Sequence, residues 1–537
     1  MEMAKLELEV VVNQREAAKE ALAREVAHAQ TKREEFDRAK AGLEEELSRK
    51  SKEADERATL LEAATAQSVL DKEEIQALKD RSIVNTITFY KYPKSISEIP
   101  LNCTAYGHSG KCPSHYPIAY NPKEDPDRSS YDTCPEYFRW IYEDLRPWAR
   151  TGISKDMVER AQSMAHLRLV IIKGKAYVET YKRPFQTRDI SSLWGILQLL
   201  RRYPGRVPDL DLMLNCGDRP TVQSSAYSGP NATSPPPLFR FCRDDTTLDI
   251  VFPDWTFWGW PEINIKPWVS LLKELEKANK KTEWVNREPY AYWKGNPYVA
   301  VSRQDLLKCN VSDKQDWNAR VYVQDWDRES KKGYKKSNLA KQCTHRYKIY
   351  IEGAAWSVSE KYILACDAVT LLVKPRYFDF FTRGLLPRHH YWPINPDDKC
   401  RSIKFSVDWG NSHQKEAQEI GKTASNFIQE ELKMEYVYDY MLHILNEYAK
   451  LLQYQPTIPE KGTELCSEAM ACSAKGLTKK FMMESMVKGP AESSPCSMPP
   501  PYDPSSLYSL LKRKTNSLKE VEIWEKKYRD NQDKQQP

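Results

Sequence analysis

Strand-like apolar runs alternate with helical segments between Cys134 and Tyr448, and this alternation constrains the fold more than any other feature. Residues 168–179 predict a β-hairpin that turns at Lys173-Gly174. Further strands are expected in the segments 210–216, 286–296 and 347–353, helices in 194–204, 266–281 and 424–452, and a helix followed by a strand in 357–373. Because strands separated by helices form parallel, doubly wound sheets, the sequence predicts an α/β protein with two such domains facing a cleft.

Composition sets the two ends of the chain apart. Residues 1–82 contain no Pro and a single Gly and are crowded with Glu, Lys, Arg and Ala, which predicts a long N-terminal helix. Charged residues interrupt its heptad track, so a self-associating coiled coil and a single solvated helix are both open. Residues 83–133 predict an irregular, Cys-containing entry segment. Residues 456–537, rich in Ser, Pro, Lys and Met, predict a mostly disordered tail with one short helix near 518–529.

Charge and motifs exclude several classes of protein. The 81 basic and 75 acidic residues are interspersed, and no Lys/Arg block indicates nucleic-acid binding. The chain has no Cys-x-x-Cys pair and no His pair at ligand spacing, so no metal site is expected. It also lacks the glycine motifs of NTPases, dehydrogenases and serine hydrolases. Its 15 Trp and 30 Tyr suit a sugar-handling protein, because a flat ring covers the C–H face of a pyranose.

The strand expected at 210–216 leads to a candidate general base. Asp218 follows buried apolar residues, so its carboxylate projects from the carboxyl end of a strand, where open α/β sheets bind ligands. A carboxylate in that place can remove a proton from an attacking hydroxyl. The alternative is that Asp218 caps the turn before Pro220, which is a common role of Asp at strand ends.

An aromatic run follows about forty residues later. Four large rings stand within six residues, namely Trp255, Phe257, Trp258 and Trp260. One interpretation places some of them along a cleft, since a loop broken by Gly and Pro cannot turn all four inward. The other interpretation is a packed aromatic corner.

Two strand-to-turn segments suit an anionic ligand. One strand runs into Lys294, Gly295 and Asn296. Another ends near Gly353 and continues through small and hydroxyl residues, Ala354, Ala355, Ser357 and Ser359, into a helix that begins close to Lys361. Such a turn presents backbone N–H groups and a positive dipole end to a diphosphate. The alternative is a helix that packs tightly against the sheet.

The residues give opposing signals about the compartment. No apolar stretch is long enough to cross a bilayer and the N-terminus does not read as a signal peptide, which predicts a cytosolic protein. Twelve Cys and three glycosylation sequons, at Asn102, Asn231 and Asn310, favour a secretory lumen.

Seven runs in the same order resemble the plant branch of the Rumi-type protein O-glucosyltransferases, the capsule-associated glycosyltransferases of family 90. They are residues 134–148, 211–218, 235–242, 252–262, 292–296, 343–366 and 398–411, and the resemblance covers roughly 100–455. It implies a GT-B fold of two Rossmann-like domains, with residues 134–285 on the acceptor side and 286–455 on the donor side. It further implies an inverting transfer of glucose or xylose from a UDP-sugar to a Ser or glycan hydroxyl, without a metal or other cofactor.

The resemblance also implies roles for individual residues. Asp218 matches the family's catalytic base. The acceptor-contacting regions correspond to Phe185, Arg188, Trp255, Phe257 and Trp258. The donor side corresponds to Lys294, Gly295, Asn296, Arg346, Gly353, Ala354, Ala355, Trp356, Ser357, Ser359 and Lys361. Animal relatives carry an Arg at the place of Ser359, so the charge for the diphosphate would have to come from Lys361, Arg346 or the helix N-terminus.

Cysteine pairing follows from the same resemblance. Cys343 and Cys366 resemble a family disulfide, and Cys216 and Cys242 are a second expected pair. Cys103, Cys112, Cys134 and Cys400 are further candidates. Such bonds imply the lumen of the ER or Golgi. The charged N-terminal helix departs from the family, and it supports a different hypothesis. In that hypothesis the chain is a coiled-coil adaptor that carries a decayed transferase domain.

Overall fold

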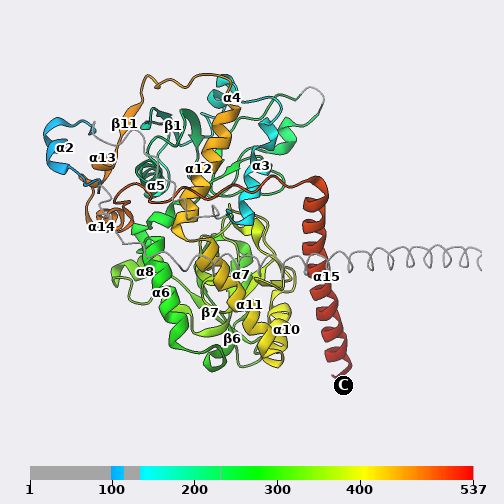
Figure 1. Ribbon diagram of the computed structural model, residues 1–537. Coiled ribbons are helices and arrows are strands. Elements are labelled where there is room, and N and C mark those ends of the chain that lie inside the picture. Colours follow the sequence, from blue (N-terminus) through cyan, green and yellow to red (C-terminus); the bar gives the residue numbers. More distant parts are fainter. Residues whose placement is uncertain (1–97, 114–132, 230–231, 536–537) are drawn as a thin grey trace, which may run out of the picture. The chain divides into compact units, whose positions relative to one another are not determined.

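The computed structural model describes residues 98–113, 133–229 and 232–535 (Figure 1). The helix expected over 1–82 and its self-association lie outside these residues. Residues 95–537 form one compact unit that contains two β-sheets. In the described residues no helix is both long enough and apolar enough to cross a membrane.

The first sheet is mixed, with the strand order β11-β2-β1-β3-β4-β5. Its strands are β1 (Leu167–Ile172), β2 (Lys175–Thr180), β3 (Leu210–Leu214), β4 (Phe239–Arg240), β5 (Ile250–Val251) and β11 (Thr463–Leu465). The predicted hairpin is confirmed, because Lys173 and Gly174 both adopt positive φ and reverse the chain in two residues. The expectation of a wholly parallel sheet is wrong here. The hairpin makes β1 and β2 antiparallel, and β3 also runs antiparallel to β1, whereas β3, β4 and β5 are parallel.

The second sheet is entirely parallel, as expected, with the order β10-β9-β8-β6-β7. Its strands are β6 (Glu288–Gly295), β7 (Ala319–Val323), β8 (His345–Tyr350), β9 (Val369–Val373) and β10 (Trp392–Ile394). Helices α9 (Ser359–Leu364), α10 (Lys399–Ser412) and α11 (Gln414–Asn426) pack against these strands. The five residues of β9 are all buried, and four of them are apolar.

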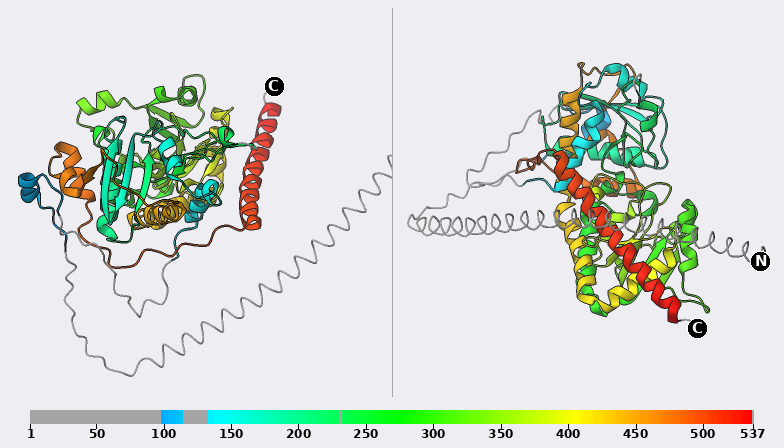
Figure 2. Two further views of the ribbon diagram at one scale, coloured as in Figure 1. Left: turned by 90° about the horizontal axis from the view of Figure 1, so that it is seen from above. Right: turned by 90° about the vertical axis from the view of Figure 1, so that its right-hand side faces the viewer.

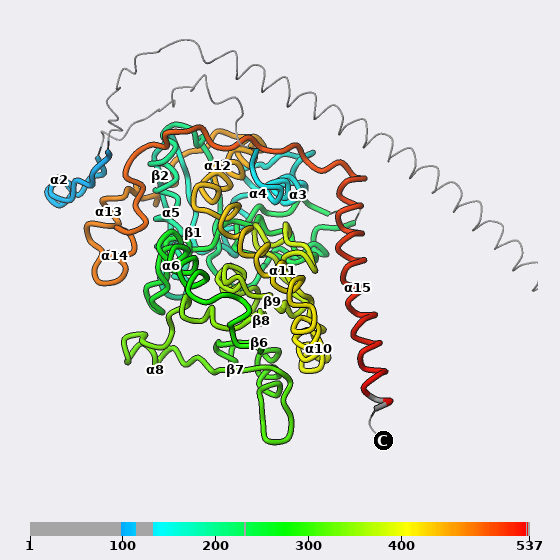
Figure 3. The backbone as a smooth tube through the Cα atoms, turned by 60° about the horizontal axis from the view of Figure 1, so that its bottom comes forward, coloured from blue at the N-terminus to red at the C-terminus, as the bar shows by residue number. Residues whose placement is uncertain are grey.

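The long helix expected at 424–452 is interrupted, and it does not stay with the second sheet. A π-helical turn (Phe427–Glu431) separates α11 from α12 (Met434–Leu451). Helix α12 contacts β3 and two helices of the first half, α3 (Trp140–Leu145) and α5 (Arg188–Arg202). Figure 3 shows the chain passing from α10 and α11 back to α12 beside α5. The predicted domain 286–455 is therefore too long, because its last helix belongs to the core of the first sheet.

The prediction of a mostly disordered tail over 456–537 is wrong. This segment forms β11, which extends the first sheet, and the helices α13 (Ser467–Ala471), α14 (Gly476–Ser485) and α15 (Pro504–Gln535). Three disulfides, Cys103–Cys472, Cys112–Cys466 and Cys134–Cys496, join it to the entry segment. Helix α13 lies beside α2 (Cys103–Ser109), as Figure 2 shows. Covalent links thus act together with buried side chains, such as Phe481 and Met482, in ordering this segment.

Four more helices complete the described part of the fold around the two sheets. They are α4 (Lys155–Arg160), α6 (Trp268–Lys281), α7 (Val301–Leu306) and α8 (Trp326–Lys331). Helix α15 packs on α10, where Val521 and Trp524 join the core of the second sheet. The short helix expected near 518–529 is thus part of a longer one.

Candidate active site

Asp218 lies just past the carboxyl end of β3, with 40% of its side chain exposed. The turn that delivers it is made by Asn215, whose Oδ1 accepts the Gly217 N–H at 2.8 Å. In the described residues no backbone N–H donates to the Asp218 carboxylate, so Asp218 does not cap this turn. Asn215 takes that role and leaves Asp218 with a free carboxylate oxygen at the surface.

Arg188, the first residue of α5, holds the Asp218 carboxylate. Its Nη1 lies 2.7 Å from Oδ1 of Asp218, and its guanidinium covers the ring of Trp255 at 4.3 Å. Because Arg188 is buried, its ion pair with Asp218 and its contact with the Trp255 ring together restrict the Arg188 side chain to one orientation. The structure therefore gives Arg188, expected to contact the acceptor, a direct contact with the candidate base.

The aromatic run forms a packed corner. Trp255, Phe257 and Trp258 lie in a short 3-10 helix (Trp255–Trp258) and are each almost completely buried. Trp258 donates from Nε1 to the hydroxyl of Tyr438 on α12 at 3.1 Å. Their expected contact with an acceptor is not supported, because neighbouring rings cover their faces. Trp255 reaches the site indirectly, through Arg188.

Phe185 is the apolar residue that the site leaves open, with 66% of the residue exposed. The guanidinium of Arg188 lies 5.3 Å from its ring centre. The loop that carries Phe185 is attached to the segment after the aromatic corner by two hydrogen bonds: Trp260 Nε1 donates to Gln186 Oε1 at 2.8 Å, and Thr187 Oγ1 donates to Glu262 Oε2 at 2.9 Å. An exposed ring is thus positioned beside Arg188, the ion-pair partner of Asp218.

The two predicted donor turns meet at the carboxyl edge of the second sheet. Lys294, Gly295 and Asn296 end β6, and the segment after β8 begins beside them. Arg303 of α7 connects the two turns, since Nε donates to Glu352 O at 2.9 Å, Nη1 to Asn296 O at 3.3 Å and Nη2 to Ile351 O at 3.0 Å. No sequence motif singled out Arg303, and its spacing from both strands carries no signal.

The donor turn also contacts the loop of the candidate base. Arg219 Nε donates to Ala354 O at 3.1 Å. Because Arg219 follows Asp218 directly, this bond brings the base within one residue of the second half of the fold. The two strand ends that sequence patterns identified separately therefore border one site.

The segment 353–359 is less open than expected. The N–H of Gly353 donates to Ala355 O at 2.9 Å, that of Ser357 to the Tyr350 hydroxyl at 3.1 Å, and that of Ser359 to Ser357 Oγ at 3.4 Å. Ala355 and Trp356 are buried. The alternative of tight packing thus describes part of the turn, whereas Gly353, Ala354 and the residues 357–359 stay partly exposed.

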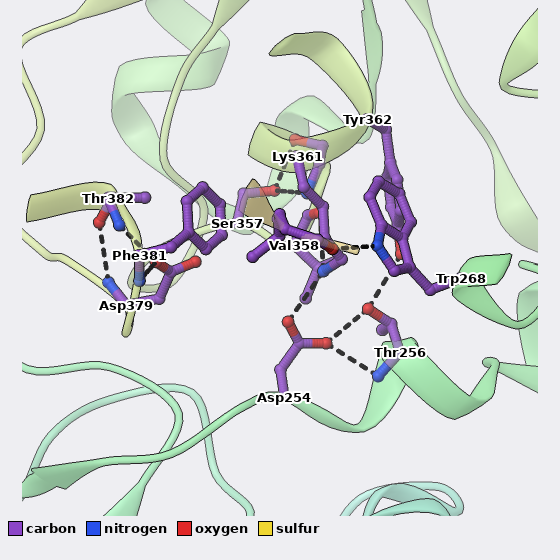
Figure 4. Close-up of polar contacts among 12 residues, drawn as sticks. Asp254, Thr256, Trp268, Ser357, Val358, Lys361, Tyr362, Asp379, Phe381 and Thr382 are labelled. Carbon is purple, nitrogen blue, oxygen red and sulfur yellow. Dashed lines mark hydrogen bonds and ion pairs between the residues drawn. The ribbon is translucent and has the colours of Figure 1, made fainter. Parts of the chain in front are cut away.

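Lys361 does not face a donor (Figure 4). It is 1% exposed, and its Nζ lies 2.8 Å from Asp254 Oδ2. Burial alone lowers the pKa of Lys361, but the charge of Asp254 outweighs burial and raises that pKa above its ordinary value. Thr256 also donates its N–H to Asp254 at 2.8 Å. Lys361 therefore neutralises a buried carboxylate and cannot supply charge to a diphosphate.

Arg346 lies at the wrong end of the sheet. It is the second residue of β8, whose first residue pairs with the first residue of β6. Its Nη1 donates to Asn411 Oδ1 at 3.1 Å, and its guanidinium covers Trp284 at 5.0 Å. The expected donor contact is wrong, because the donor turns follow the opposite, carboxyl ends of these strands.

Glu352 is a second residue that the motif analysis did not select. It follows β8 and accepts the N–H groups of Arg376 at 3.0 Å and of Tyr377 at 2.7 Å. Burial raises the pKa of the Glu352 carboxyl to about 7. Its position directly after a buried strand was the available signal.

Cysteine pairing agrees with the expectation at one of the two pairs. Cys343 and Cys366 form a disulfide, and Cys309–Cys400 is a further one. The expected bond between Cys216 and Cys242 is wrong, because both are buried thiols. Cys242 Sγ instead donates to Asp218 O at 3.2 Å, which adds support to the base loop.

Comparisons with known proteins find the same similarity over most of the chain. Residues 129–525 match the family described as glycosyl transferase family 90. The chain is 27% identical to protein O-glucosyltransferase 1 of Bos taurus over 354 residues, which cover 62% of this chain and 85% of that protein. It is 26% identical to the Homo sapiens protein of that name over the same shares, and 25% identical to O-glucosyltransferase rumi of Drosophila melanogaster over 63% of this chain and 81% of that one. These relatives are animal proteins, so a plant branch stays a prediction.

Proposed function

Because the chain belongs to glycosyl transferase family 90, and is thus a glycosyltransferase, we propose that it transfers glucose from UDP-glucose to a protein Ser hydroxyl with Asp218 as general base. UDP-xylose as donor and a glycan hydroxyl as acceptor are the nearest alternatives. The observation that carries the proposal is the position of Asp218, which is half-exposed, fixed by Arg188 and one residue from the contact with the donor turn.

The proposed reaction is a single displacement in a GT-B arrangement of the two halves, with no metal. The acceptor oxygen attacks C1 of the sugar while the Asp218 carboxylate accepts the hydroxyl proton. The bond between C1 and the phosphate oxygen breaks, and UDP leaves with the electron pair. Attack from the side opposite to the leaving group inverts the configuration at C1.

The first experiment compares the unmodified protein with Asp218→Asn. We expect a loss of transfer of at least about a hundredfold, because general-base catalysis is worth about 10²–10⁴-fold, with UDP affinity and fold unchanged. Asp209→Asn is the matched control. Asp209 lies at the amino end of β3 and accepts the Lys173 N–H at 2.7 Å, far along the strand from Asp218. Full activity of Asp218→Asn would refute the assignment of the base.

A second assay, of donor binding and turnover, distinguishes a transferase from the adaptor hypothesis. Purified protein is tested for binding and turnover of UDP-glucose and UDP-xylose. An adaptor would neither bind nor consume a donor, whereas a transferase binds at least one of them and releases UDP.

The lumen of the ER or Golgi is the compartment that we propose. Five disulfides in the described residues support it, because such bonds persist in oxidising compartments. Thiol alkylation in denaturant, followed by mass measurement, should label two cysteines before reduction and all twelve after it. Twelve labelled cysteines before reduction would contradict this compartment.

A further inference from the structure

A nucleotide diphosphate brings negative charge into the donor turn, and two of the cations expected to meet it, Lys361 and Arg346, do not lie there. Lys294 does lie at this edge of the sheet, where its Nζ donates to Lys336 O. Ser359 is neutral, Lys361 is paired with Asp254, and Arg346 lies at the amino edge of the sheet. The α9 helix has only six residues, and the N–H groups of Ser357 and Ser359 already have partners. Further positive charge is therefore expected from other side chains around Gly353 and Ala354.

Arg303 is the buried cation on one side of this turn. Its Nη2 would lie 3.5 Å from a Cβ added at Gly353, so the guanidinium borders the glycine directly. Three of its five N–H groups donate to carbonyls, which leaves one N–H on each Nη without a partner in the described chain. No carboxylate forms an ion pair with it in the described residues, and burial lowers the pKa of Arg303. The nearby Glu352 offsets only part of this effect, and an anion bound beside Arg303 would relieve the cost of burial further.

Arg219 is the cation on the other side. Its Nε donates to Ala354 O, and it is exposed to solvent. Both of its Nη groups have no partner in the described part of the chain. The fixed Nε keeps the guanidinium at the turn, so its remaining donors are available to a ligand bound there.

We propose that Arg303 and Arg219 bind the diphosphate of the nucleotide sugar from two sides of the Gly353–Ala354 turn. They would take the place of the arginine that animal relatives carry where this chain has Ser359. This inference rests on the proposed function, since it assigns the anion-binding residues of the same donor site. It also gives a reason for glycine at 353, because a side chain there would stand between Arg303 and the phosphates.

Isothermal titration of UDP and of uridine tests the proposal, because the two probes differ in the diphosphate. Arg303→Gln and Arg219→Gln should each weaken UDP binding about tenfold or more and leave uridine binding unchanged, as expected for one charge-assisted contact. Arg287→Gln is the control for the buried site. Arg287 also donates to three carbonyls, of Thr282, Cys366 and Asn279, but at the amino end of β6. Arg146→Gln is the exposed control, since within the described residues the ion-pair partner of Arg146 is Glu143.

The outcomes distinguish this inference from the proposed function. If the unmodified protein binds neither UDP nor a UDP-sugar, the proposed function fails. If it binds UDP and both arginine variants bind UDP equally well, the inference alone is overturned. Circular dichroism checks the fold of each variant. Should Arg303→Gln not fold, Arg219→Gln decides, and unchanged UDP affinity in that variant overturns the two-sided site.

Discussion

Nη1 of Arg188 lies 2.7 Å from the Asp218 carboxylate while the same guanidinium covers Trp255 at 4.3 Å. The candidate base is thus positioned by a cation that the buried aromatic corner holds in turn. A packed residue that never touches a substrate can in this way control where the proton acceptor stands.

Replacement of Arg188 should lower kcat without changing UDP affinity. In Arg188→Ala the carboxylate loses its fixed orientation, and a misplacement of about 1 Å can cost about a hundredfold in rate. Arg188→Lys keeps the charge but not the planar contact with Trp255, so it should recover part of the loss. Steady-state kinetics and UDP titration check this. A raised acceptor KM at unchanged kcat would show acceptor binding instead.

Phe185→Ala should raise the acceptor KM and leave UDP binding unchanged. Its exposed ring stands beside Arg188, the partner of Asp218, where it can cover an apolar face of an acceptor. The loss of one such contact is worth about 1.5–3 kcal/mol, or roughly tenfold or more in KM. Tyr508→Ala on α15, where Tyr508 is 65% exposed, is a matched control. Equal KM values for the two variants would contradict this role.

Lys361→Met should destabilise the fold rather than the donor complex. It leaves Asp254 as a buried carboxylate without a counter-ion, which costs about 3–5 kcal/mol. The double variant with Asp254→Asn should recover much of this loss, because the remaining amide is neutral. Urea unfolding measures the effect. A normal free energy of unfolding combined with weaker UDP binding would return Lys361 to the donor site.

Glu352→Gln should stabilise the protein at pH 8 but not at pH 4. The pKa of Glu352 is raised to about 7 by burial, so between about pH 4.5 and 7 the unfolded chain releases this proton while the folded chain keeps it. Stability of the unmodified protein therefore falls as pH rises through this window, and the neutral amide avoids that loss. Thermal unfolding of both proteins across this range checks the sign. A constant difference in Tm would contradict it.

The sequence predicted individual strands and turns better than the contacts that they make with distant parts of the chain. Asp218 was found because a buried strand followed by Asn, Cys and Gly has a recognisable pattern. The ion pair with Arg188, 30 residues away, has no such pattern, because it depends on how α5 packs beside β3. The same holds for Lys361 and Asp254, which are 107 residues apart.

Two predictions that were based on composition, the cleft-lining aromatic run and the disordered C-terminal segment, failed for different reasons. The aromatic run could be counted, but the burial of Phe257 and Trp258 depends on α12 and α6, which cover them from elsewhere in the chain. The C-terminal segment looked disordered because it is rich in Ser, Pro, Lys and Met, but it is joined to the entry segment by cysteines whose partners lie more than 350 residues away and packs on α6 and α10. Neither kind of contact can be read from a local window.

The three disulfides between the entry segment and the C-terminal segment also impose an order on biosynthesis. Cys103, Cys112 and Cys134 leave the ribosome when their partners, 354–369 residues later, have not been made. At about 5–20 residues per second this delay is roughly tens of seconds. Three thiols must stay unpaired, or pair wrongly and be reshuffled, until synthesis is nearly complete. A ribosome that stops before β11 therefore releases a chain that has nearly all of both sheets but three cysteines without their partners.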